Sequence, residues 1–572
     1  MAHYTPLHQA AADVVARLAN VDAADLKVET PPKPAMGDLA VGCFAIAKAQ
    51  GKNPAAVAQD IATAFQPTGM LASASAAGPF VNFRADRAAA LGWTIEHATR
   101  GTLVPTELGA GKSITIDYSS PNISKHLAYH HIRSTMIGHS LVQIFRALGY
   151  RVIGINHLGD WGKTHGMLVA AWHKWGPIEP LDISVLNDLY VRYREAIKAN
   201  PALDGEARAY FKKLEAGDAE TRALWTRFRD ISLAEYQTVY DALGIQFDEI
   251  RGESAYEHDI PRVMSELAAS KLLTESEGAT VVWLDGEKEP VIIKTSDDTT
   301  VYATRDLATA EYRWTTYHPA RSLYVVDRGQ ALHFKQVFKV LALMGHADAA
   351  KVCEHVPFGL VRIGGKKTGT RTGQVVLLKD VLAEAEQRVR DVIVAGGADL
   401  SPEVLASVAP VVGIGAVVFA NLASQRERDV DFEWEKVIAL TGDSGPYLQY
   451  SHARCASIVR KAAKDGLTVA GEVDYRKLGT DAEWAVARRL MDYADVVVRA
   501  AAVCEPHLVC HYLLDLAATF SRWYTEGNGD ASLRVLCEDA PTRTARLALV
   551  GAVQATLASG LGLLGIAAPE QM

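Results

Sequence analysis

The segment from residue 113 to residue 155 constrains the fold most, because its pattern is strand, turn, helix and strand. The apolar run from Ile114 to Tyr118 predicts a strand, and Ser119-Ser120-Pro121-Asn122 closes it and opens a long helix. Apolar residues then recur at helical spacing up to Leu148, Gly149 ends the helix, and residues 152–155 resume a strand. This is a β-α-β unit of a parallel sheet, in which ligands bind beyond the carboxyl ends of the strands. We therefore expect residues 119–122 at the mouth of a ligand site.

The length of the chain predicts several domains. At 572 residues it is too long for one core, and about 150 residues per domain suggests three or four. Hydrophobic residues make up 49% and charged residues 22%, which is ordinary for folded chains. The net charge of −8 gives no global electrostatic case for nucleic-acid binding, so any RNA contact must use local basic patches.

Composition also points to a cytoplasmic location without a membrane role. The six cysteines are scattered without C-x-x-C spacing, so we expect reduced, mostly buried thiols. The N-terminus lacks the basic and then apolar order of a signal peptide. Two charge-free stretches, 404–424 and 547–569, carry polar residues and glycines, and we expect both to be buried helices of a large core.

Changes of pattern along the chain divide it into four regions. Residues 1–105 read as a small α+β domain with helices at 7–18, 40–49 and 55–65 and a strand at 80–83. Residues 112–380 form an α/β domain with an inserted, largely helical region at about 185–300, whose aromatic residues are spaced to face a core. Helical patterns fill 381–440 and 441–572.

Several longer motifs occur in a fixed order along the chain. They are Met36-Gly37-Asp38-Leu39-Ala40, the strand–turn signature after Asp117, Asn156-His157-Leu158-Gly159-Asp160-Trp161-Gly162, Tyr302-Ala303-Thr304-Arg305-Asp306, and Gly445 to Arg454. Together they resemble the arginyl-tRNA synthetases, which belong to class I. The resemblance implies an N-terminal tRNA-contacting domain, a Rossmann-type catalytic domain with a helical insertion, a helical stem-contact region at 381–440, and an all-α anticodon-binding domain at 441–572.

The resemblance also implies an arginine site, which needs carboxylates for a planar guanidinium. Asp117 and Asp306 are expected to face the guanidinium, Asn122 and Gln330 to hold the α-amino end, and Ser119 and Tyr302 to complete the pocket. The structural alternative is that Asp306 pairs with Arg305 or a helix end and that Asn122 is only a turn residue.

Two elements are expected to bind ATP. The His-x-Gly-His sequence of the family falls on Ala128-Tyr129-His130-His131, so that one histidine is kept and His130 replaces the glycine. The lysine-rich loop of the family falls on residues 364–376, where Thr368-Gly369 replaces Met-Ser. By resemblance the catalytic residues are His131, Lys366, Lys367 and Arg371, and the ATP-binding residues are His130, His131, Gly159, Asp160, His333 and Lys367. Mg²⁺ is expected to arrive with ATP.

A metal site is a further hypothesis for the histidines near residue 130. His126 and His130 lie four residues apart and, on a helix, would share one face. Lys125 lies beside them and no acidic third ligand has a suitable offset. We therefore expect no protein-bound metal.

The resemblance predicts an arginine–tRNA ligase that forms arginyl-adenylate from ATP and L-arginine and transfers the arginyl group to tRNA(Arg). The alternative is a paralogue that keeps the arginine pocket, has lost or changed adenylation, and acts on arginine or an arginyl group in another pathway. We expect a monomer. RNA contacts would come from basic residues among aromatic ones in the last domain, namely Arg454, Arg460, Lys461, Lys464, Arg488, Arg489 and Arg499.

Overall fold

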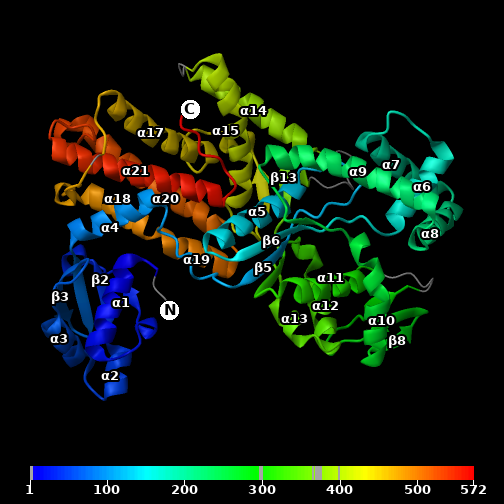
Figure 1. Cartoon of the computed structure of the whole chain (residues 1–572), viewed down its shortest axis with the longest axis horizontal. Coiled ribbons are helices and arrows are strands. Elements are labelled where there is room, and N and C mark those ends of the chain that lie inside the picture. Colours follow the sequence, from blue (N-terminus) through cyan, green and yellow to red (C-terminus); the bar gives the residue numbers. More distant parts are fainter. Residues whose placement is uncertain (1–3, 296–300, 364–365, 368–375, 397–399, 470) are drawn as a thin grey trace. The chain divides into compact units, whose positions relative to one another are not determined.

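The chain forms two compact units. The computed structural model describes residues 4–295, 301–363, 366–367, 376–396, 400–469 and 471–572. The terminal unit comprises Met1–Glu107, Gly396–Val408 and Ala439–Met572, and the central unit comprises Leu108–Ala395 and Ala409–Ile438. Each unit is described by itself below (Figure 1).

A parallel sheet of five strands lies at the heart of the central unit. Its order is β12-β11-β5-β6-β7, and all four strand pairs are parallel. The strands are β5 (Ser113–Asp117), β6 (Arg151–Asn156), β7 (Glu249–Ile250), β11 (Arg321–Tyr324) and β12 (Cys353–His355). Helix α5 (His131–Ala147) connects β5 to β6, as expected for the β-α-β unit. Because strands are added on both sides of β5, the carboxyl end of β5 is the place where ligands bind in such sheets.

The segment between β5 and α5 differs from the prediction, because the helix begins at His131 rather than after Asn122. The backbone groups of residues 122–125 instead form hydrogen bonds with side chains of the later helix α9 (Ala219–Ala242). The Tyr236 hydroxyl donates to the carbonyls of Asn122 and Lys125 at 2.8 and 2.7 Å, and the Ser124 backbone N–H donates to the Ser232 hydroxyl at 2.8 Å. These tertiary bonds satisfy groups that a helix would otherwise pair internally.

Four helices follow β6 and form a core of their own. They are α6 (Lys163–Trp175), α7 (Ile183–Ala199), α8 (Ala202–Glu215) and α9. Tyr193, Phe228 and Tyr240 are buried as the spacing of the aromatic residues predicts, whereas Tyr190 is half-buried. Figure 1 shows α6, α7 and α8 side by side with α9 running along them.

A second layer of the central unit combines helices with a small antiparallel sheet. Strand β9 (Ala279–Val282) pairs on one side with β10 (Val291–Lys294) and on the other with β8 (Leu273–Ser276), so these strands form a sheet separate from the parallel one. The helices are α10 (Ile260–Ala269), α11 (Tyr302–Tyr317), α12 (Ala331–Leu343) and α13 (Ala347–Val352). They share one hydrophobic core with β9 and β10.

The remaining strands of the central unit form a three-stranded sheet in the order β14-β13-β15. These are β13 (Val361–Ile363), β14 (Lys366–Lys367) and β15 (Val430–Phe432). Helices α14 (Leu378–Ala395) and α15 (Pro402–Leu422) lie between them in the sequence.

The terminal unit combines a four-stranded antiparallel sheet with helices. The sheet has the order β1-β2-β4-β3, from β1 (Val28–Glu29), β2 (Leu39–Gly42), β4 (Phe80–Ala85) and β3 (Leu71–Ala77). The expected helix over 40–49 is wrong in its first part, because residues 40–42 belong to β2 and α2 covers only Phe44–Gln50. Strand β2 is buried on both faces, so its apolar run has no alternation that would mark a strand. The other helices of the unit are α1 (Pro6–Ala19), α3 (Pro54–Ala64), α4 (Arg87–Arg100), α17 (Gly445–Lys464), α18 (Asp481–Met491), α19 (Tyr493–Val503), α20 (His507–Gly529) and α21 (Ala540–Leu563).

The two charge-free stretches both form helices, α15 and α21. By length and composition each is long and apolar enough to cross a membrane, and 50% and 67% of their most apolar windows are buried within the fold. All six cysteines are unpaired, and every one except the half-buried Cys353 is buried.

Candidate active site

The turn after β5 is held in an unusual backbone conformation. Ser119 and Ser120 have φ values of 69° and 48°, a region that non-glycine residues rarely occupy. The Ser119 backbone N–H donates to the Ser134 hydroxyl at 3.0 Å, and its side chain lies 2.8 Å from the Tyr240 hydroxyl. Backbone strain of this kind persists where surrounding contacts enforce it, and it is common at functional sites.

Asp117 is already paired within the chain. Its Oδ2 accepts a 2.7 Å hydrogen bond from Nη2 of Arg313, and the two side chains are 6% and 1% exposed. The Ser120 hydroxyl donates to the other carboxylate oxygen at 2.7 Å. Burial alone would lower the pKa of Arg313, but the Asp117 carboxylate raises that pKa above its usual range. The expectation that Asp117 is presented to a substrate guanidinium is therefore not met in this structure, because an internal guanidinium occupies the carboxylate.

Asp306 is the fifth residue of α11 and is half-buried. Its Oδ2 is 2.6 Å from Nε2 of His333 in the first turn of α12. The neighbouring Arg305 turns away and donates to Glu253 at 2.8 Å in a buried pair, where burial raises the pKa of Glu253 to about 7. Among the described residues Asp306 is thus paired with His333, and Arg305 with Glu253. Asp306 keeps a partly accessible carboxylate oriented by one imidazole.

Three other residues expected at the arginine site are exposed. Tyr302 begins α11 with 60% of its surface accessible. Gln330 ends a short 3-10 helix before α12 and is exposed, and Asn122 is exposed beyond β5. Asn122 follows β5 and Gln330 follows β11, so both face solvent near the carboxyl ends of those strands, where ligands bind in such sheets. The Tyr302 ring instead packs beside the Arg305 guanidinium, 5.4 Å from the ring centroid.

Gly159 and Asp160 follow β6, and the contact of Gly159 with Asn122 holds the loop after β6 against the turn after β5. Gly159 pairs with Asn122, and a Cβ on Gly159 would lie 2.0 Å from the Asn122 side-chain oxygen, so only glycine fits there. Asp160 is 2% exposed, and its two oxygens accept from the backbone N–H and the hydroxyl of Ser254 at 2.9 and 2.7 Å. Burial raises the pKa of Asp160. Both carboxylate oxygens of Asp160 thus have a partner within the chain, and the role of Asp160 in ATP binding stays a prediction.

His131 is the first residue of α5, and its Nδ1 is engaged by the backbone. This atom lies 3.0 Å from both the amide nitrogen and the carbonyl oxygen of Ala128. The His130 ring lies against it, with centroids 4.2 Å apart. Burial, together with the neighbouring His130, lowers the pKa of His131 to about 3. A neutral imidazole whose Nδ1 accepts the Ala128 N–H carries its proton on Nε2, the atom left for a ligand.

The two expected ATP elements are joined by their backbones. Tyr129 N–H donates to the carbonyl of Val376 at 2.8 Å, Leu378 N–H donates to the carbonyl of Leu127 at 2.9 Å, and Ala128 forms an antiparallel bridge with Leu377. The end of the lysine-rich segment is therefore fixed beside the start of α5. Lys366 and Lys367 form β14, but their side chains, and the whole of Arg371, lie outside the described residues.

The hypothesis that His126 and His130 bind a metal requires both residues to lie on one helix, and they do not. His126 precedes α5, and its two ring nitrogens lie 3.2 Å from Glu235 and 3.0 Å from Ser184. His126 and His130 therefore do not share a helical face.

Arg133 and Arg313 are two buried arginines whose structural roles sequence reasoning missed. Arg133 on α5 donates to the carbonyls of Arg426 and Arg428 at 2.9 and 3.1 Å, and also to that of Asn421. Arg313 lies seven residues after Asp306, on the same face of α11, which is the one signal that could have linked it to the site.

Comparison with known proteins decides the family. The model of the class I tRNA synthetase catalytic domain for arginine matches residues 98–434. The chain belongs to the arginyl-tRNA synthetase family. The family's N-terminal domain model matches residues 5–85, and the DALR anticodon-binding domain model matches residues 448–572.

Relatives from the same family are similar to this chain along nearly its whole length. An arginine–tRNA ligase of Clostridium botulinum is 39% identical over 559 residues and covers 97% of both chains, and one of an Exiguobacterium species is 42% identical and covers 99% of both. The solved arginyl-tRNA synthetase of Thermus thermophilus has a TM-score of 0.82 at 27% identity, covering 99% of this chain and 100% of its own. The predicted family, with its Rossmann-type and helical domains, is thus confirmed.

Buried neutral histidines predict a pH-dependent stability of the central unit. Burial lowers the pKa of His131 and His165 to about 3 and that of His139 to about 4. The unfolded chain takes up protons near pH 6.5, so this stability is complete well above pH 6.5 and is lost as the pH falls towards the folded pKa values of about 3 to 4. The linkage amounts to about 1.4 kcal/mol per histidine at pH 5.5.

We expect a lower melting temperature at pH 5.5 than at pH 7.5, and a smaller difference in the His139→Gln variant. The matched control is His258→Gln, which removes a 73% exposed imidazole and should leave the pH dependence unchanged. An equal pH dependence in all three proteins would contradict the prediction.

Proposed function

We propose that this protein is an arginine–tRNA ligase. It would use ATP to activate L-arginine as arginyl-adenylate, with release of pyrophosphate, and then transfer the arginyl group to tRNA(Arg). The observation that carries the proposal is the backbone bridge between Ala128 and Leu377, because it joins the two ATP elements beside the carboxyl end of β5. Relatives named arginine–tRNA ligase, similar over nearly the full length, support the same activity.

The arginine pocket is proposed to depend on Asp306. Its half-buried carboxylate, oriented by His333 at 2.6 Å, would accept hydrogen bonds from the substrate guanidinium. Asn122 and Gln330 would hold the α-amino end, and Tyr302 would pack against the side chain. Asp117 would act indirectly, since it binds Arg313 and so fixes the helix that carries Asp306.

Activation is proposed to work by positioning and charge stabilisation. A carboxylate oxygen of arginine attacks the α-phosphorus of ATP, the bond to the bridging oxygen breaks, and pyrophosphate leaves. His131 would donate its Nε2–H to a phosphate oxygen, and Lys366, Lys367 and Arg371 would stabilise the leaving pyrophosphate. Bound Mg²⁺ would neutralise phosphate charge. His130 and Gly159 would border the nucleotide, and His333 would contribute mainly through Asp306.

The transfer step involves tRNA(Arg) as the second substrate. A hydroxyl of the terminal adenosine attacks the arginyl carbonyl carbon, and AMP leaves. In the terminal unit Arg454 lies over the rings of Tyr450 and Tyr524, at 5.1 and 5.4 Å from their centroids. Such arginine–aromatic surfaces suit unpaired RNA bases. We further propose a monomeric cytoplasmic enzyme.

The deciding experiment is arginine-dependent ATP–pyrophosphate exchange, measured with and without tRNA(Arg). We expect exchange that is strongest when tRNA(Arg) is present, together with attachment of radiolabelled arginine to the tRNA. Absence of exchange under both conditions, with arginine binding still detected by calorimetry, would overturn the ligase and favour a paralogue with altered chemistry.

A further inference from the structure

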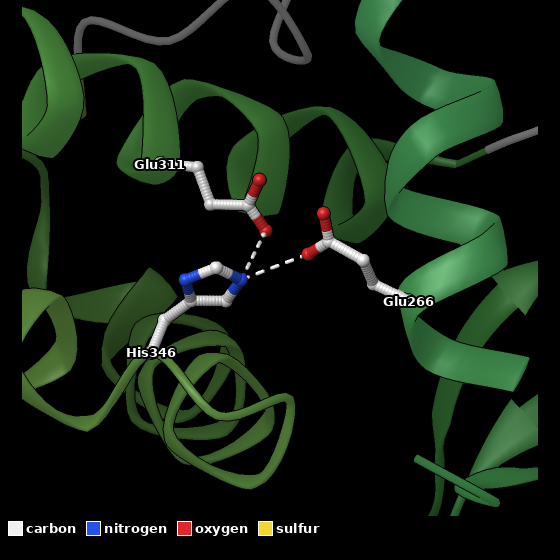
Figure 2. A group of neighbouring side chains, drawn as sticks. All are labelled: Glu266, Glu311 and His346. Atoms are coloured by element: carbon white, nitrogen blue, oxygen red, sulfur yellow. Dashed lines mark hydrogen bonds and ion pairs between the residues drawn. The ribbon is translucent and has the colours of Figure 1, made fainter. Parts of the chain in front are cut away.

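Three side chains of the central unit converge at a place that the proposed reaction does not use. Glu266 lies on α10, Glu311 lies on α11, and His346 precedes α13. Nε2 of His346 is 2.8 Å from Oε2 of Glu266 and 3.3 Å from Oε1 of Glu311, as Figure 2 shows. One ligand atom from each residue lies within 4.8 Å of the others.

Arg262 contacts one carboxylate oxygen of each glutamate. We call these two the outer oxygens and the other two the inner oxygens. Arg262 donates to Oε1 of Glu266 at 2.9 Å and also bonds Oε2 of Glu311. The inner oxygens, Oε2 of Glu266 and Oε1 of Glu311, are the two that face His346. Outer contacts of this kind orient the ligands in protein metal sites.

Glu311 brings a buried, incompletely paired carboxylate oxygen to the inner pair. The residue is 2% exposed, and its Oε1 makes no hydrogen bond among the described residues although it points at the imidazole. A buried carboxylate oxygen without a hydrogen bond is costly unless a cation compensates it.

Charge also favours a divalent cation. Glu266, Glu311 and Asp259, which lies 3.5 Å from Arg262, bring three negative charges against the single positive charge of Arg262. This excess of carboxylates over the one guanidinium favours a bound cation.

We propose that Glu266, Glu311 and His346 form a zinc site. Tetrahedral zinc with bonds of about 2.1 Å separates its ligand atoms by about 3.4 Å. The His346–Glu311 separation of 3.3 Å fits this value, and the His346–Glu266 separation of 2.8 Å needs only a small side-chain movement. Glu266 and His346 are about one third exposed, which leaves the fourth position open to water. The ion ties α10 and the turn before α13 to α11 through three protein ligands.

The same atoms also describe a metal-free network in which the His346 imidazole bridges the two glutamates. That network needs no zinc and predicts no selective loss of zinc on mutation. Direct measurement of zinc therefore separates the two arrangements.

The test uses the full-length chain, stripped with a chelator, dialysed against an equal concentration of Zn²⁺, and analysed by elemental mass spectrometry and calorimetry. We expect one zinc ion per chain and a higher melting temperature with zinc. His346→Gln and Glu266→Gln should each weaken zinc binding at least about tenfold, because each removes a direct ligand. Both variants keep hydrogen-bonding groups of similar size.

The matched control is His173→Gln, which removes a surface imidazole 3.9 Å from Glu220. It should bind zinc like the unmodified chain. The proposal is overturned if the unmodified chain binds no zinc, or if His346→Gln and Glu266→Gln bind as tightly as the control.

Discussion

Replacing Asp306 by asparagine should lower kcat/KM for arginine by about 100-fold or more. The variant keeps the size of the side chain but removes the charge that would face the guanidinium. Hydrogen bonds between charged partners contribute about 1.5–3 kcal/mol each, and a loss of about 3 kcal/mol corresponds to more than 100-fold. The measurement is arginine-dependent pyrophosphate exchange, with arginine affinity from calorimetry.

Two further variants test whether the loss of kcat/KM in Asp306→Asn arises in the arginine pocket. Asp348→Asn removes an exposed carboxylate on α13 and should leave activity within twofold. His333→Gln should give an intermediate loss, because it removes the 2.6 Å contact that orients Asp306 but leaves the carboxylate charge. Unchanged arginine affinity in Asp306→Asn would show that another group binds the guanidinium.

The β-α-β unit could be predicted because its residues carry local signals. The apolar run from Ile114 and the helical spacing up to Leu148 describe elements whose faces are buried by their immediate neighbours. The parallel arrangement then places residues 119–122 at the carboxyl end of β5 without further information.

The start of α5 could not be placed in this way. Residues 123–130 contain no proline or glycine that would stop a helix, and the bonds that hold them come from Tyr236 and Ser232, more than 100 residues away in the sequence. Long-range hydrogen bonds of this kind override local helical preference.

The sequence also could not identify the hydrogen-bond partners of the charged site residues. The resemblance selects Asp117 and Asp160 as site residues, but the sequence does not show which groups form hydrogen bonds with their carboxylates. Ser254 lies 94 residues from Asp160, and Arg313 lies 196 residues from Asp117. Only the packing of α11 and of the loop after β7 against the parallel sheet brings these partners within hydrogen-bonding distance.

The Asp117–Arg313 pair leads to the largest expected loss of stability. Asp117→Asn leaves the guanidinium of Arg313, which is 1% exposed, without its counter-charge. Breaking a buried ion pair on one side costs about 3–5 kcal/mol, whereas replacing both partners by uncharged groups is often nearly neutral. We therefore expect a marked fall in melting temperature for Asp117→Asn and substantial recovery in the double variant Asp117→Asn with Arg313→Met.

An exposed pair provides the control for this cycle. Glu195→Gln breaks a pair with Lys198 in which both side chains are at least 60% exposed, and such pairs contribute about 0–1 kcal/mol. The melting temperature and the arginine affinity are measured for each of these variants. If Asp117→Asn loses arginine binding at unchanged melting temperature, Asp117 binds the substrate directly and the internal pair opens when arginine enters. If the melting temperature falls and the double variant recovers both stability and arginine binding, Asp117 acts through Arg313 on the helix that presents Asp306.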